Sequence, residues 1–137
     1  MINFLIITHG EFGAYLMEAA ETIVGRQASG VMVVSASSRL GVAEIRRRIG
    51  AAVVELSGPD GLVVFCDMPA GSPVNLSFPL IKDRAAVEII SGINLPMIIS
   101  AFSHRGDMTL AALVAKVLRD GRNAVSDVRR LVTARMG

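Results

Sequence analysis

Several residue types are scarce in this 137-residue sequence, and each shortage excludes a class of protein. Cysteine occurs once, at Cys66, so the chain cannot form an internal disulfide and cannot build a zinc site from cysteines. Tryptophan is absent and aromatic residues make up 4% of the chain, which leaves no stacking platform for bases. The single cysteine leads us to expect no metal site. The low aromatic content and a net charge of only +2 lead us to expect no nucleic-acid partner.

Long hydrophobic runs are also missing. Residues 4–7 and 62–66 are typical apolar runs, far below the ~20 residues that a membrane-spanning helix needs. The N-terminus has no basic lead and no small-residue cleavage site, so we expect no signal peptide and a cytoplasmic protein. Hydrophobic residues nevertheless form 52% of the chain, which is enough for one core and predicts a single domain over residues 1–137.

The apolar residues follow two different periodicities in alternation. β-Rich runs that are continuous except at Asn3 and Glu88 predict buried strands over residues 2–7, 31–34, 62–66 and 87–90. Stripes at helical spacing predict helices over residues 12–23, 42–56, 95–102 and 110–118, and a short helix from Ser72. This alternation predicts a doubly wound α/β fold with four mainly parallel strands in the order 2-1-3-4 and helices on both faces.

Polar residues follow the first and third predicted strands, which are neighbours in that order. His9 and Gly10 follow the first strand, and Asp67 and then Gly71 and Ser72 follow the third. Since ligands bind where the strand order reverses, we expect His9 and Asp67 to meet there. The helix start at Ser72 offers unpaired N–H groups for phosphate oxygens. The plain alternative is that His9 and Asp67 are only a strand end and a turn residue.

Three motifs in this order resemble the mannose-family enzyme IIA component of the bacterial phosphoenolpyruvate-dependent sugar phosphotransferase system (PTS). They are Thr-His-Gly at residues 8–10, Asp67 followed by Gly-Ser-Pro-Val-Asn at 71–75, and Ser-Gly-Ile-Asn-Leu-Pro-Met at 91–97. The resemblance implies that His9 carries a phosphoryl group, received from the phosphocarrier protein HPr and passed to a IIB component. It also implies that Asp67 hydrogen-bonds the other ring nitrogen and that Ser72 lies near the phosphoryl group.

The chemistry of imidazole agrees with these roles. A neutral ring attacks with the nitrogen that carries no hydrogen, so a carboxylate that accepts the other N–H selects the tautomer and aims the ring. We therefore expect His9 and Asp67 to be the catalytic pair and Gly10, Gly71 and Ser72 to bind phosphate, with no metal and no cofactor.

The resemblance carries expectations about partners as well. It implies a phosphotransferase component whose IIB partner is a separate chain, since the sequence stops at Gly137, and which meets the membrane only through IIC and IID. It also implies a homodimer, in which relatives exchange a C-terminal strand between subunits. Val125, Val128, Leu131 and Val132 are spaced as in a helix instead, so both a strand and a helix remain open there.

Other candidates receive plainer interpretations. The family's usual paired glycine is Ala70-Gly71 here, which leaves the loop conformation open. Cys66 is expected in the core, His104 at a solvated helix end, Arg105 on a partner surface, and residues 46–48, three arginines, on a solvated or docking face. Two other functions remain: a regulatory module that responds to phosphorylation of His9, and a small hydrolase that uses Ser72 or His9.

Overall fold

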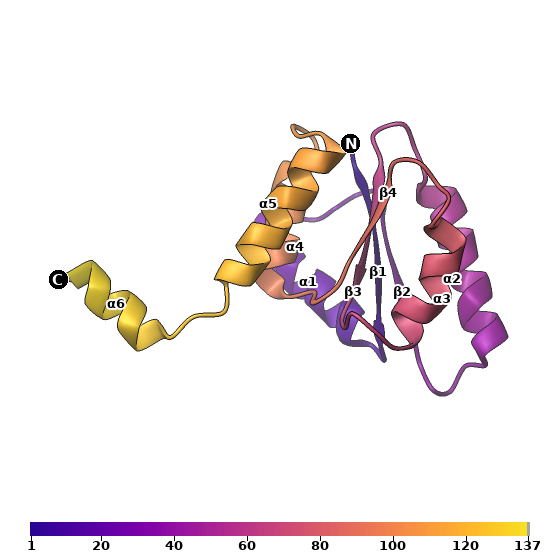
Figure 1. Cartoon of the computed structure of the whole chain (residues 1–137), viewed down its shortest axis with the longest axis horizontal. Helices are drawn as coiled ribbons and strands as arrows, with labels where there is room; N and C mark the ends of the chain where they lie inside the picture. Colours follow the sequence, from indigo (N-terminus) through magenta and orange to yellow (C-terminus); the bar gives the residue numbers. More distant parts are fainter. Residues whose placement is uncertain (137) are drawn as a thin grey trace.

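The computed structural model describes residues 1–136, in which a four-stranded parallel sheet lies between two layers of helices (Figure 1). The strands are β1 (Asn3–His9), β2 (Val31–Ala36), β3 (Leu62–Cys66) and β4 (Val87–Ile90). Every pairing is parallel, and the order is β2-β1-β3-β4. The predicted fold class and strand order are confirmed; Gly137, the last residue of the predicted domain, lies outside the described residues.

The helices divide between the two faces of the sheet. They are α1 (Phe12–Val24), α2 (Val42–Leu56), α3 (Ser72–Ile81), α4 (Leu95–His104), α5 (Leu110–Asn123) and α6 (Val128–Met136). Figure 1 shows α1, α4 and α5 on one face and α2 and α3 on the other. Within residues 1–136, none of these helices is long and apolar enough to cross a bilayer.

Successive residues of the central strands supply two separate cores. Phe4 and Phe65 belong to the core under α1, α4 and α5, where their ring centroids are 5.6 Å apart. Leu5 and Val64 belong to the core under α2 and α3. Because side chains alternate across a strand, covering both faces requires an apolar residue at every position, which explains the unbroken apolar runs.

The predicted apolar stripe of the first helix is correct for Leu16 and Ala20, which pack against or belong to the core. It is wrong for Phe12, Tyr15 and Ile23, which are exposed, and it missed the buried Gly13. A Cβ atom on Gly13 would lie 2.9 Å from Oγ1 of Thr8, so only glycine lets α1 approach β1 this closely. With Gly13 against β1, Leu16 and Met17 pack on the core while Tyr15 faces solvent.

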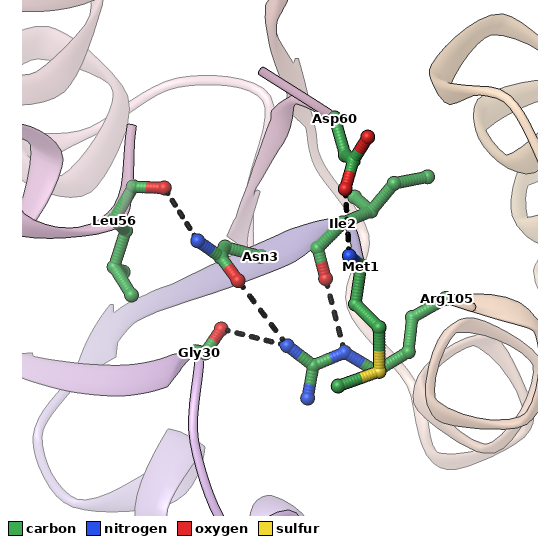
Figure 2. A network of polar contacts seen from close by, with 7 residues as sticks. All are labelled: Met1, Ile2, Asn3, Gly30, Leu56, Asp60 and Arg105. Carbon is green, nitrogen blue, oxygen red and sulfur yellow. Dashed lines mark hydrogen bonds and ion pairs between the residues drawn. The ribbon is translucent and has the colours of Figure 1, made fainter. Parts of the chain in front are cut away.

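Arg105 is buried, so its predicted place on a partner surface is wrong (Figure 2). Its guanidinium donates hydrogen bonds to the backbone oxygens of Ile2 (3.0 Å), Ser29 (2.9 Å) and Gly30 (3.3 Å). It also lies over the ring of Phe4, 5.2 Å from the centroid. Within residues 1–136 the oxygens of Ile2 and Ser29 have no other donor, so Arg105 satisfies groups that would otherwise be unpaired. The oxygen of Gly30 also accepts a hydrogen bond from the N–H of Phe4, so Arg105 adds a second bond there.

The C-terminal segment is a helix in this structure, and the predicted exchanged strand is not found within residues 1–136. The helix α6 extends away from the sheet after α5, and none of its residues is buried (Figure 1). Val128, Leu131 and Val132 are exposed along it. The helical spacing of these residues therefore predicted the local structure correctly.

Candidate functional site

His9 and Asp67 lie in contact at the carboxyl ends of two neighbouring strands. His9 is the last residue of β1 and Asp67 directly follows β3, and these strands pair in register up to Ile7 and Cys66. Nδ1 of His9 is 2.8 Å from Oδ2 of Asp67, and the backbone N–H of His9 donates to the same oxygen at 2.9 Å. The two bonds fix both the ring and the main chain of His9 to one carboxylate.

The charge state of Asp67 decides the tautomer of His9. Burial alone would raise the pKa of Asp67, but the hydrogen bonds from the backbone N–H and ring of His9 and the charge of that ring hold this pKa below its ordinary value. An ionised carboxylate only accepts hydrogen bonds, so Nδ1 of His9 must carry the hydrogen. The lone pair of the neutral ring is therefore on Nε2, the nitrogen directed away from Asp67.

The free side of the His9 ring faces the turn before α3. A Cβ atom on Gly71 would lie 3.4 Å from Nε2 and 3.3 Å from Cε1 of His9, and Gly71 has φ +105°. Gly71 is the N-cap of α3 and no side chain caps the helix, so the first-turn N–H groups of Ser72 and Val74 have no partner within the helix. These groups and the helix dipole can stabilise an anion held near Nε2.

The loop after His9 is held by two hydroxyl groups that the sequence reasoning missed. Thr8 is fully buried, and its Oγ1 accepts a hydrogen bond from the N–H of Gly13 at 2.7 Å. Ser35, on the neighbouring strand, donates to the backbone oxygen of Gly10 at 2.7 Å. The signal was a hydroxyl residue near the carboxyl end of each of two mainly apolar strands, since buried polar residues are retained where they satisfy backbone groups.

Ser72 does not complete a hydrolytic triad. It is exposed at the first position of α3, and within residues 1–136 no hydrogen bond joins it to His9. A serine nucleophile would need its hydroxyl within hydrogen-bond reach of the imidazole. The geometry therefore gives no support to Ser72 as a nucleophile activated by His9.

The third motif, residues 91–97, is structural. Asn94 caps α4 by accepting a hydrogen bond from the N–H of Met97 at 3.0 Å, and its amide donates to the backbone oxygen of Gly121 at 3.2 Å. It thus joins the start of α4 to the end of α5 and contributes no group to the His9 site.

The remaining candidates lie away from His9. His104 is at the C-terminal end of α4, where Nδ1 lies 3.5 Å from Oδ1 of Asp107, as expected for a solvated helix end. Cys66 is buried in the core as predicted, and burial raises the pKa of its thiol to about 12. Among residues 1–136, no cluster of three His, Cys, Asp or Glu side chains offers a metal site.

The arginines at residues 46–48 are on α2, where two of them pair with one acid. Arg47 binds both carboxylate oxygens of Glu44, at 2.9 and 2.7 Å, and Arg48 binds Oε1 at 2.9 Å. Hydrogen bonds from these two arginines lower the pKa of Glu44 to about 2. Two guanidiniums on one carboxylate leave this surface positive.

The fold and the site together define a class of protein. A doubly wound parallel sheet presents an oriented histidine where the strand order reverses, opposite the open N-terminus of a helix. A sequence profile of the EIIA-man family, described as PTS system fructose IIA component, matches residues 3–118. The chain therefore belongs to the EIIA-man family, which the motifs had indicated.

Individual relatives agree with this family. The mannose-specific EIIAB component of Escherichia coli (strain K12) is 26% identical over 129 residues, which are 93% of this chain and 40% of that protein. The fructose-specific EIIA component of Bacillus subtilis (strain 168) is 23% identical over 114 residues, 83% of this chain and 77% of that protein. The crystal structure of the PTS IIA protein associated with the fucose utilization operon of Streptococcus pneumoniae superimposes with a TM-score of 0.87 at 20% identity, covering 96% of each chain.

Proposed function

We propose that this protein is a phosphoryl carrier of a sugar phosphotransferase system, with His9 as the group that is phosphorylated. The observation that carries the proposal is the pairing of Nδ1 of His9 with the ionised Asp67, which leaves the lone pair of Nε2 facing Gly71. Membership of the EIIA-man family supports a role in sugar phosphotransfer. In this proposal HPr is the donor and a IIB component on a separate polypeptide is the acceptor.

The transfer needs only groups already at this edge of the sheet. The lone pair of Nε2 forms a bond to phosphorus while the bond from phosphorus to the donor breaks, and the donor keeps that electron pair. The ring of His9 becomes positive as the new bond forms, and Asp67 stabilises that charge at 2.8 Å. Charge on the equatorial oxygens is stabilised by the first-turn N–H groups of α3 at Ser72 and Val74, and Gly71 and Gly10 flank the phosphoryl group without side chains. Asp67 is thus a positioning residue and His9 the nucleophile.

We also propose that the chain forms a homodimer through its C-terminal arm, residues 125–136. The apolar side chains of this arm are exposed, and Val125 is 86% exposed. Apolar surface contributes to stability only when it is removed from water, so a contiguous exposed apolar arm indicates an interaction site for another surface. Light scattering on the full chain would give the mass of a dimer, and removal of the arm would give the mass of a monomer; a full-length monomer would contradict this.

Phosphorylation of His9 is tested with phosphoenolpyruvate, enzyme I and HPr. The wild-type protein should acquire acid-labile, alkali-stable phosphate, and His9→Ala should acquire none. Asp67→Ala should slow labelling by about 100-fold and Asp67→Asn by about 10-fold, because the amide oxygen still accepts the ring N–H. Equal labelling of wild type and His9→Ala would contradict the proposal.

A second measurement separates transport from regulation. Adding a IIB component should discharge the labelled protein if the chain passes its phosphoryl group on. Stable label in the presence of every IIB component of the same organism would instead favour the regulatory function. Ser72→Ala, which removes one candidate donor but no nucleophile, should remain labelled.

A further inference from the structure

The outer edge of β2 is open along its whole length. The strand is at one end of the order β2-β1-β3-β4, and within residues 1–136 no other strand pairs with its outer side. The N–H of Phe4 donates to the backbone oxygen of Gly30. In a parallel ladder every second residue of a strand bonds to the same neighbour, so the residues between them direct their backbone groups to the other side. The backbone groups of Val31, Val33 and Ser35 therefore point outward.

This edge has none of the features that usually prevent strand addition. The sequence of β2 is Val-Met-Val-Val-Ser-Ala, without charge, proline or glycine. Natural edge strands are normally protected by charged residues, proline or bulges. An apolar, regular edge of this kind is a template for a further strand.

A hollow of about 260 Å³ lies between the open edge and α2. Its apolar lining comes from Met32, Val33, Val34, Ala51 and Ala52. Ser35, Arg47 and Arg48 also line it. The lining therefore combines apolar side chains with two cations.

The cationic lining continues toward the loop after His9. A second hollow, of about 490 Å³, shares Ser35 and Arg48 with the first and is also lined by Arg39 and Gly10. Glu11 is the one acidic residue that lines the second hollow. Glu44 is the acid that hydrogen-bonds with both Arg47 and Arg48. Three guanidiniums therefore outnumber two carboxylates along the groove, which favours a ligand of negative charge.

We propose that the groove formed by the outer edge of β2 and α2 binds an extended, acidic segment of a partner protein, which adds to the sheet as a fifth strand. Its backbone pairs with Val33 and Ser35, its acidic side chains reach Arg47 and Arg48, and its apolar side chains face the opposite side of the sheet. The site is separate from the nucleophile, so it does not depend on His9.

Charge argues against a second copy of this chain as the occupant. Pairing β2 with β2 of another molecule would bring Arg47 and Arg48 of both copies to the same seam. Like charges at an interface oppose association, whereas an acidic segment is attracted.

The probes are two labelled, end-blocked hexapeptides, one of alternating Glu and Val and one of alternating Lys and Val. Fluorescence anisotropy on the full chain should show binding of the Glu peptide at least about 10-fold tighter than that of the Lys peptide, and this preference should weaken in high salt. Equal affinities, a preference for the Lys peptide, or no binding of either would overturn the proposal.

Matched variants separate this groove from general charge. Arg47→Glu should weaken binding of the Glu peptide by about 10-fold, whereas Arg46→Glu, the same charge change on α2 outside both hollows, should change it by less than about 2-fold. Equal effects would contradict a defined site. His9→Ala should bind the peptide as the wild type does, so failure of the phosphoryl-carrier proposal would leave this one standing.

The backbone contribution is tested with Val33→Pro. Proline at this position removes an outward N–H and leaves the ladder to β1 intact, so circular dichroism should show a folded protein that binds the Glu peptide at least about 10-fold more weakly. Undiminished binding by the folded variant would exclude strand addition. A dimer of wild-type chains that Val33→Pro dissociates would show that a second copy occupies the edge instead.

Discussion

At the scale of single residues, the site depends on one oxygen atom. Oδ2 of Asp67 accepts hydrogen bonds from both the ring and the backbone N–H of His9, while Oδ1 is buried and has no partner within the described chain. A buried acceptor without a donor costs free energy, so the carboxylate is retained for what Oδ2 does. The residue thus aims the imidazole at some expense to stability.

The pH dependence of folding follows from the same carboxylate. The pKa of Asp67 in the folded state lies below its ordinary value of 3.8, so its contribution to stability is complete above that value and is lost as the pH falls through the folded-state pKa. Urea unfolding of wild type and Asp67→Asn should therefore differ more at neutral pH than at about pH 3. A difference that grows on acidification would contradict the lowered pKa.

The thiol of Cys66 should be unreactive in the folded protein. It is fully buried, and burial raises its pKa to about 12, so almost no thiolate is present at pH 8. An aromatic disulfide reagent should label Cys66 only after unfolding in guanidinium. Rapid labelling of the native protein would show that this core opens, and would revive a role for the thiol.

At the scale of elements, the start of α3 sets the room beside Nε2 of His9. Gly71 combines φ +105° with a position facing this nitrogen, so in the proposed mechanism it serves both the turn and the approach of a phosphoryl group. A side chain there would strain the backbone and fill the space in front of the nitrogen.

Gly71→Ala should therefore slow phosphorylation of His9 by about 10-fold or more, since small displacements of reacting groups cost large factors in rate. The matched control is Gly50→Ala inside α2, where a Cβ atom meets nothing within 4 Å. It should leave labelling unchanged and stabilise the protein by about 0.5–1 kcal/mol, because alanine favours a helix interior. Equal labelling rates for both variants would remove Gly71 from the site.

At the scale of the whole molecule, Arg105 joins segments that are far apart in sequence. From the end of α4 it reaches the oxygens of Ile2 and Gly30 (Figure 2) and that of Ser29, at the end of the sheet opposite His9. A Cβ atom on Gly30 would lie 2.3 Å from the guanidinium, so glycine is needed where the arginine passes. The end of the sheet opposite His9 is thus held together by the hydrogen bonds of Arg105.

Arg105→Met should destabilise the fold by about 2 kcal/mol or more, because it leaves the backbone oxygens of Ile2 and Ser29 without donors. Arg26→Met, at an exposed position, should change the unfolding free energy by less than about 0.5 kcal/mol. Chemical denaturation measures both. A loss at Arg105 no larger than that at Arg26 would show that water replaces the guanidinium.

The sequence by itself determined the fold and the pair of residues at its reversal point. A strand covered on both faces is apolar at every position, so residues 62–66 were found with their observed bounds, and the edge run 87–90 was found despite Glu88. The order 2-1-3-4 then places His9 beside Asp67, since they lie at the carboxyl ends of neighbouring strands. These features are determined by local periodicity and by topological rules.

Only the tertiary structure decided what depends on contacts between distant segments. Helical spacing could not show which side of α1 faces the sheet, because that side is set by the close approach at Gly13. Nor could it show that Arg105 is buried, because the carbonyls that require its hydrogen bonds lie on loops brought together by folding. Periodicity reports the environment of one element, whereas unpaired backbone groups arise only when several elements meet.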